Sequence, residues 1–228
     1  MRSGAVPGFL PSRHGFAFAN RWPAGPAFEL RIRYLRIGVG EVAEGLCAGM
    51  CFAAADRFVR GEVPPTDTVP PARGTPLFHE IARRQLDSLH WLVMAPFRFW
   101  WTAARLRVGR WMVRDQVRQW LAIREEIDAG RPAMLGLVRT ANVNPFSLTA
   151  NHEVLGFAYE AGPGEATIRI YDPNHPGSDD VAIRLRIGGV AARPEPPAFA
   201  TPPVSLEQTT GEPLLALLHL PYRPVPAR

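Results

Sequence analysis

The C-terminal half of the chain consists of short apolar runs separated by Gly, Pro, Asn and Asp. Runs of this length and composition, bounded by turn-forming residues, predict β-strands. We expect strands at residues 133–138, 153–159, 166–171, 181–187 and 213–220.

The preceding part of the chain shows helical spacing of its apolar residues instead. A first helix is expected to begin near Cys47 and to continue through a stretch rich in Ala, Met and Phe to Val59, with Gly61 as its stop. A second helix is expected at residues 76–92, and further helical structure at residues 94–127.

The order of these elements indicates the fold class. Helices come first and strands afterwards, with no alternation of strand and helix, which is typical of an α+β fold with an antiparallel sheet. Apolar residues that alternate with arginine over residues 28–37 predict a half-buried strand or an extended lead-in. A length of 228 residues fits one domain over residues 1–228, with a core at about 28–222 and irregular, Pro-rich termini.

Composition narrows the classes of partner and compartment. All 26 basic residues are arginine, and the net charge of +5 is spread over many segments, so we do not expect a nucleic-acid-binding protein. The two cysteines lie four residues apart, which does not suit a disulfide, and no apolar stretch is long enough to span a membrane. With no apolar segment typical of a signal peptide, we expect a cytoplasmic protein without stable membrane insertion.

Cys47 is the candidate nucleophile. The first turn of a helix has unpaired backbone N–H groups and the positive end of the helix dipole, and both favour a thiolate. The backbone N–H of the same residue can also donate to a tetrahedral oxyanion. The alternative interpretation is that both cysteines are small buried apolar residues.

His152 and Asp172 are the candidate base and orienting acid. They lie at equal distances from residue 162, and the turn residues Gly162-Pro163-Gly164 lie at that midpoint. An unbroken antiparallel hairpin would place the two side chains opposite each other on one face. A carboxylate bonded to one ring nitrogen leaves the other free to deprotonate a thiol.

Two segments resemble the papain-like cysteine peptidase superfamily, in particular its C39-like branch of bacteriocin-leader peptidases. The segment 45–58, GLCAGMCFAAADRF, is similar to the turn and helix that carry the family's cysteine. The segments NHEVLGFAYE and IRIYDPNHPG are similar to its histidine strand and to its following strand that ends in Asp-Pro. The resemblance covers roughly residues 40 to 190 and implies a papain-like fold with the order Cys47, His152, Asp172.

Other residues remain open for each role. Cys51 precedes an aromatic residue, as the papain nucleophile does, and is the alternative nucleophile. Asn174 could orient the histidine in place of Asp172, although it lies beyond Pro173. The family has a glutamine shortly before the cysteine as an oxyanion donor, and this chain has none there; Asn20 is the nearest upstream side-chain amide.

The sequence therefore predicts a hydrolase that cleaves a peptide or amide bond through a thioester, with a peptide or protein as substrate and with no metal or cofactor. The missing glutamine leaves a second hypothesis, an inactive papain-like module that binds a peptide or protein partner. Residues 97–120 combine arginines with large aromatics. We expect a core helix whose arginines extend to the surface, with binding to an anionic membrane surface as the alternative.

Overall fold

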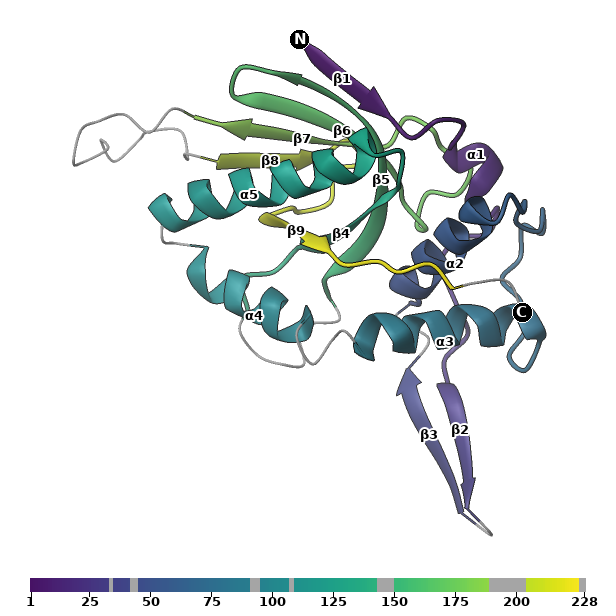
Figure 1. Ribbon diagram of the computed structural model, residues 1–228. Helices are drawn as coiled ribbons and strands as arrows, with labels where there is room; N and C mark the ends of the chain where they lie inside the picture. The colour runs from purple at the N-terminus through teal and green to yellow at the C-terminus, as the bar shows by residue number, and fades with distance from the viewer. Residues whose placement is uncertain are drawn as a thin grey trace.

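A computed structural model of the chain describes residues 1–32, 35–41, 45–90, 95–106, 109–142, 150–188 and 204–225. It combines helices with an antiparallel sheet, as an α+β fold does (Figure 1). The helices are α1 (Pro11–His14), α2 (Cys47–Val59), α3 (Pro76–His90), α4 (Ala95–Arg105) and α5 (Gly109–Asp128). The strands are β1 (Arg2–Ala5), β2 (Pro26–Ile32), β3 (Leu35–Glu41), β4 (Ala133–Val138), β5 (His152–Gly162), β6 (Glu165–Tyr171), β7 (Ala182–Ile187), β8 (Val204–Gln208) and β9 (Ala216–Leu220).

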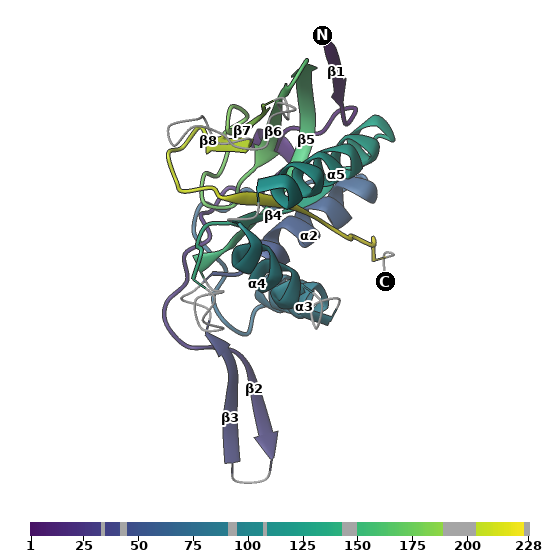
Figure 2. The ribbon, with the colours of Figure 1, turned by 90° about the vertical axis from the view of Figure 1, so that its left-hand side faces the viewer.

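The seven-stranded sheet has the order β8-β7-β6-β5-β4-β9, and β1 pairs with the second half of β5. Helix α2 packs against β5, and α5 packs along β9, β4 and β5 (Figure 2). The five strands expected from the sequence are present as β4 to β7 and β9. Strands β1 and β8 were not predicted, because both are short and lie next to Pro- and Gly-rich sequence.

Helix α2 lies inside the molecule, and its residues 48–56 are all buried. Gly49 permits the close approach of α3, because a Cβ atom there would lie 2.2 Å from the carbonyl oxygen of Ile81. The Gly49 N–H donates to Oε1 of Gln85 in α3 at 2.8 Å, which satisfies one of the donors that a helix start leaves unpaired. Helix α2 is therefore held between α3 and the sheet.

The N-terminal residues are part of the core, although the sequence analysis placed them outside it. Strand β1 joins the sheet through β5. Phe16 and Phe18 are fully buried and their rings stack with centroids 5.1 Å apart, while the ring of Phe18 meets Trp22 edge-on. Burial of large aromatic rings outweighs the local tendency of Pro- and Gly-rich sequence to remain irregular.

The turn of the β5–β6 hairpin lies where the sequence predicts it, at Pro163-Gly164, and Gly164 has the positive φ of 75° that such a turn requires. The register is not continuous, however. Ala158 pairs with Arg169, but the next pair joins Gly156 to Ile170, so Phe157 is an extra residue in β5. This β-bulge shifts the rest of the strand by one position.

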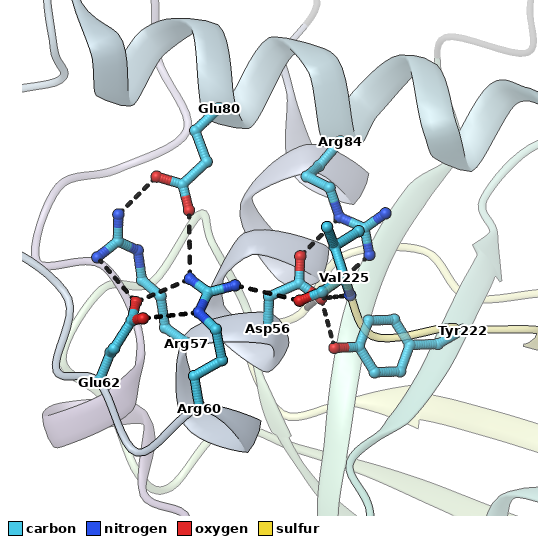
Figure 3. A network of polar contacts seen from close by, with 8 residues as sticks. All are labelled: Asp56, Arg57, Arg60, Glu62, Glu80, Arg84, Tyr222 and Val225. Carbon is cyan, nitrogen blue, oxygen red and sulfur yellow. Dashed lines mark hydrogen bonds and ion pairs between the residues drawn. The ribbon is translucent and has the colours of Figure 1, made fainter. Parts of the chain in front are cut away.

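A charged network at the C-terminal end of α2 holds the C-terminal segment of the chain (Figure 3). Asp56 of α2 and Arg84 of α3 are buried and form an ion pair, with Nε to Oδ2 at 2.8 Å. The hydroxyl of Tyr222 and the backbone N–H of Val225 both donate to Asp56 Oδ1, at 2.7 and 3.1 Å. Arg84 also donates to the carbonyl of Arg223 at 3.0 Å. The segment after β9 is thereby attached to two helices.

The helical stretch that the sequence predicts at residues 94–127 is two helices, α4 and α5, with a break after Arg105. Helix α5 covers the free edge of β9. Gln116 makes two hydrogen bonds with the backbone of Leu217, at 2.9 and 3.1 Å, and Gln119 accepts from the His219 N–H at 2.8 Å. Side-chain amides thus pair an edge that would otherwise leave backbone groups unsatisfied.

The aromatic residues of these two helices divide between core and surface. Trp111 and Trp120 are partly buried against the core. Phe97 and Trp101 are 48% and 39% exposed and their rings stack, and the guanidinium of Arg105 lies 3.7 Å from the centroid of the Trp101 ring.

No helix in the described ranges is both long enough and apolar enough to cross a membrane.

Strands β2 and β3 form a separate two-stranded sheet where the sequence predicts a strand or an extended segment at residues 28–37. Their register pairs Phe28 with Val39 and Ile32 with Leu35. Figures 1 and 2 show this hairpin projecting from the rest of the molecule. It is an appendage to the sheet and helices that position the site.

Candidate active site

Cys47 is the first residue of α2 and is partly exposed. The turn before it is supported by Asn20, whose Oδ1 accepts a hydrogen bond from the Leu46 N–H at 2.6 Å. Gly45 has a φ of 93°, and a Cβ atom there would lie 2.5 Å from Asn20 Nδ2. A glycine is therefore required beside the Asn20 amide. The turn presents a reachable thiol at the positive end of a helix.

His152 is the first residue of β5 and is 4% exposed. Its Nε2 atom lies 2.7 Å from Oδ1 of Asp172, and Cys47 lies close enough to the ring to influence its pKa. Burial alone would lower the pKa of His152. Its interactions with the Asp172 and Cys47 side chains outweigh burial and raise the pKa to about 10. His152 and Asp172 are therefore in direct contact, with Cys47 nearby.

The bulge at Phe157 explains how Asp172 reaches the histidine. In the register before the bulge, Asp172 would lie opposite Leu155 and on the other face from His152. After the bulge, the register places it opposite Val154, on the same face as His152 and diagonal to it. The direct opposition that we expected is thus corrected to a diagonal contact.

Asp172 is fully buried and its two carboxylate oxygens have three partners. Oδ1 accepts from His152 and, at 2.8 Å, from the backbone N–H of Asn174; Oδ2 accepts from Gln208 Nε2 at 2.8 Å. Burial would raise the pKa of Asp172, but the hydrogen bonds and charge of His152 and the Asn174 N–H hold it below its usual value. Sequence reasoning missed Gln208, which belongs to the unpredicted strand β8.

Cys51, the alternative nucleophile, and Asn174, the alternative orienting residue, make other contacts. Cys51 is fully buried, and its Sγ lies 3.4 Å from the carbonyl oxygen of Glu153. Burial raises the pKa of the Cys51 thiol well above its usual range, so Cys51 is neither reachable nor ionised near neutral pH. Asn174 touches Asp172 through its backbone, and its side-chain oxygen accepts from Asn20 Nδ2 at 3.3 Å.

Asn20 lies next to the candidate nucleophile although it is far from it in sequence. Its backbone N–H donates to the Pro173 carbonyl at 2.9 Å, and its Oδ1 also accepts from Trp22 Nε1 at 3.3 Å. The side-chain amide is therefore anchored between the turn before Cys47 and the segment after Asp172. A segment that the sequence alone leaves as a turn thus connects the two halves of the site.

Comparisons of this chain with protein-family models, with curated proteins and with solved structures give no match.

Proposed function

We propose that this chain is a cysteine peptidase-like hydrolase that cleaves a peptide or amide bond. The observation that carries the proposal is the position of His152, whose imidazole is bonded to the Asp172 carboxylate at 2.7 Å, while Cys47 lies near enough to the ring to raise its pKa. A partly exposed thiol at a helix start, a buried imidazole and a fully buried carboxylate suit nucleophilic catalysis.

The first half of the reaction forms a thioester. His152 holds the proton of Cys47, and the sulfur attacks the carbonyl carbon of the substrate to form a C–S bond and a tetrahedral oxyanion. The backbone N–H of Cys47 is one donor to that oxyanion, and Asn20 Nδ2, beside Gly45, is the candidate second donor. The intermediate then collapses, the C–N bond breaks, and His152 gives its proton to the leaving amine.

The second half releases the acyl group. His152 takes a proton from a water molecule, whose oxygen attacks the thioester, and the C–S bond breaks to return the thiolate and a carboxylic acid. An amine in place of water would give acyl transfer through the same steps. Asp172 keeps the imidazole oriented throughout and stabilises its charged form.

The arrangement of elements supports a papain-like fold within the α+β class. A buried helix carries the cysteine at its start and packs on an antiparallel sheet whose strand β5 brings the histidine. The order cysteine, histidine, aspartate along the chain agrees with that proposal.

Alkylation by iodoacetamide at pH 7 tests the proposed nucleophile. We expect rapid labelling of Cys47 in the wild type, no rapid labelling in Cys47→Ala, and labelling at least tenfold slower in His152→Ala, which loses the base. Cys51→Ala is the matched control, and it should keep the rapid phase because Cys51 is fully buried. Equal rates in the wild type and in His152→Ala would contradict the proposal.

The contacts of Asn20 support a second candidate function. Its amide is engaged by both Leu46 and Asn174, which suits a structural role and a module that binds a peptide without cleaving it. The burst of p-nitrophenol from p-nitrophenyl acetate separates the two functions. A hydrolase gives a burst and turnover, and Asn20→Ala reduces acylation about a hundredfold, as loss of one oxyanion donor does. Rapid alkylation without acylation would favour the binding module.

A further inference from the structure

The carboxylate of Asp172 has a partner on the side away from His152. Gln208, at the end of β8, donates through Nε2 to Asp172 Oδ2 at 2.8 Å and is 1% exposed. On the other side of its amide, Arg139 Nη2 donates to Gln208 Oε1 at 3.0 Å. A chain of hydrogen bonds therefore runs from the partly buried Arg139 through Gln208 and Asp172 to His152.

This chain of hydrogen bonds has one direction. A guanidinium can only donate, so the oxygen of the Gln208 amide must face Arg139 and its NH₂ group must face Asp172. An ionised carboxylate can only accept, so the Nε2 atom of His152 must carry a proton. The Nδ1 atom is then the one available to the thiol of Cys47. Arg139 and Asp172 thus fix the orientation of the Gln208 amide, and Asp172 fixes which nitrogen of His152 carries the proton.

Contacts of the backbone hold Gln208 and Arg139 in place. Gln208 pairs with Ile183 of β7, and the next residue, Thr209, donates its N–H to the Ala182 carbonyl at 2.9 Å. Arg139 directly follows β4, and its backbone N–H donates to Oδ1 of Asn151, the residue before His152, at 3.1 Å. The arginine and the histidine are therefore tied to each other at the ends of neighbouring strands.

We propose that Gln208, oriented by Arg139, is a positioning residue that supports the charged form of His152 through Asp172. This inference rests on the proposed function of the Cys47 site. Without the Gln208 donor, Asp172 would hold its negative charge less well and would stabilise the imidazolium less. Proton transfer from Cys47 to His152 would then be less favourable.

The rate of Cys47 alkylation by iodoacetamide, measured from pH 5 to pH 10, tests this role. We expect Gln208→Leu to move the midpoint of the acid limb upward by about one pH unit, with a rate near that of the wild type restored at pH 9.5. Gln208→Met also removes the donor and has a flexible side chain of similar length, so it should move the midpoint in the same direction. This second variant keeps the test valid if Gln208→Leu does not fold.

Gln116→Leu is the matched control. Gln116 is also 1% exposed and also makes two hydrogen bonds through its amide, but with the backbone of Leu217. Gln116→Leu should lower the melting temperature without moving the pH midpoint of Cys47 alkylation. Gln208 variants with the midpoint of the wild type would overturn the positioning role while leaving Cys47 and His152 as an active pair. Failure of the proposed function is distinct, because the wild type itself would then label as slowly as His152→Ala.

Discussion

At the scale of single residues, Glu153 is a buried acid next to the base of the candidate site. It is 9% exposed, and within the described ranges its Oε2 atom is buried without a hydrogen-bond partner. Burial raises the pKa of Glu153 to about 7, although the charge of His152 acts in the opposite direction. Because the folded protein then binds a proton that the unfolded chain releases above about pH 4.5, stability falls between pH 4.5 and 7.

Replacement of Glu153 by Met should remove this loss. We expect Glu153→Met to exceed the wild type in free energy of unfolding by about 1–3 kcal/mol at pH 8, where the folded wild type must ionise a buried carboxyl group. The gain should be smaller at pH 5, where that group is neutral. Urea unfolding at the two pH values measures the difference, and an equal gain at both would contradict the role of ionisation.

The residues of the site differ in how far the sequence could reveal them. His152 and Asp172 belong to one hairpin, so the turn was enough to predict that they lie near each other, but the bulge that puts them on one face was not predicted. Asn20 and Gln208 are remote in sequence from their partners. Gln208 reaches Asp172 only because β8 and β7 follow β6 across the sheet, and no local pattern of residues encodes that lateral order.

At the scale of elements, the charged network on α2 joins the C-terminal segment to two helices (Figure 3). Asp56→Ala would leave Arg84 buried without its main partner, and we expect a loss of about 3–5 kcal/mol in the free energy of unfolding. Asp87→Ala is the control, because Asp87 also bonds to Arg84 but its side chain is 40% exposed. Asp87→Ala should lower the free energy of unfolding by only about 0–1 kcal/mol. Similar losses in the two variants, measured by urea unfolding, would show that burial of the Asp56 pair is unimportant.

The elements that were predicted accurately are those with clear signals in their own sequence. Helix α2 and strands β4 to β7 have clear apolar periodicity and distinct stops, and they occur where the sequence places them. The division of the predicted helical region 94–127 into α4 and α5, and the bulge at Phe157, were not predicted from the sequence. The bulge is decisive for the site, because a regular strand would put Asp172 on the wrong face.

At the scale of the whole molecule, the β2–β3 hairpin is separate from the sheet that positions the site (Figure 1). Its ends are close together, since Pro26 pairs with Glu41. We expect a protein with Gly-Ser-Gly in place of residues 27–40 to fold and to keep its Cys47 alkylation rate within about twofold. By contrast, removal of residues 1–9 takes away β1 and the buried Val6 and Phe9, and cooperative unfolding should be lost.

Thermal unfolding and alkylation of both proteins measure this contrast. Loss of the rapid labelling phase on replacement of the hairpin would show that the hairpin supports the site.

The sequence predicted the α+β class, but it placed the N-terminus outside the core. That difference arises because aromatic residues in a Pro-rich segment have no periodicity, and their burial depends on the surface that the rest of the chain provides.

The support of the candidate nucleophile comes largely from residues that are synthesised after it. Cys47 is in the first quarter of the chain, whereas His152, Asp172 and Gln208 follow it in the second half. A growing chain therefore carries an ordinary cysteine until β5, β6 and β8 have emerged and closed around it. The hydrogen-bonded site of His152, Asp172 and Gln208 can form only after the folding of the sheet.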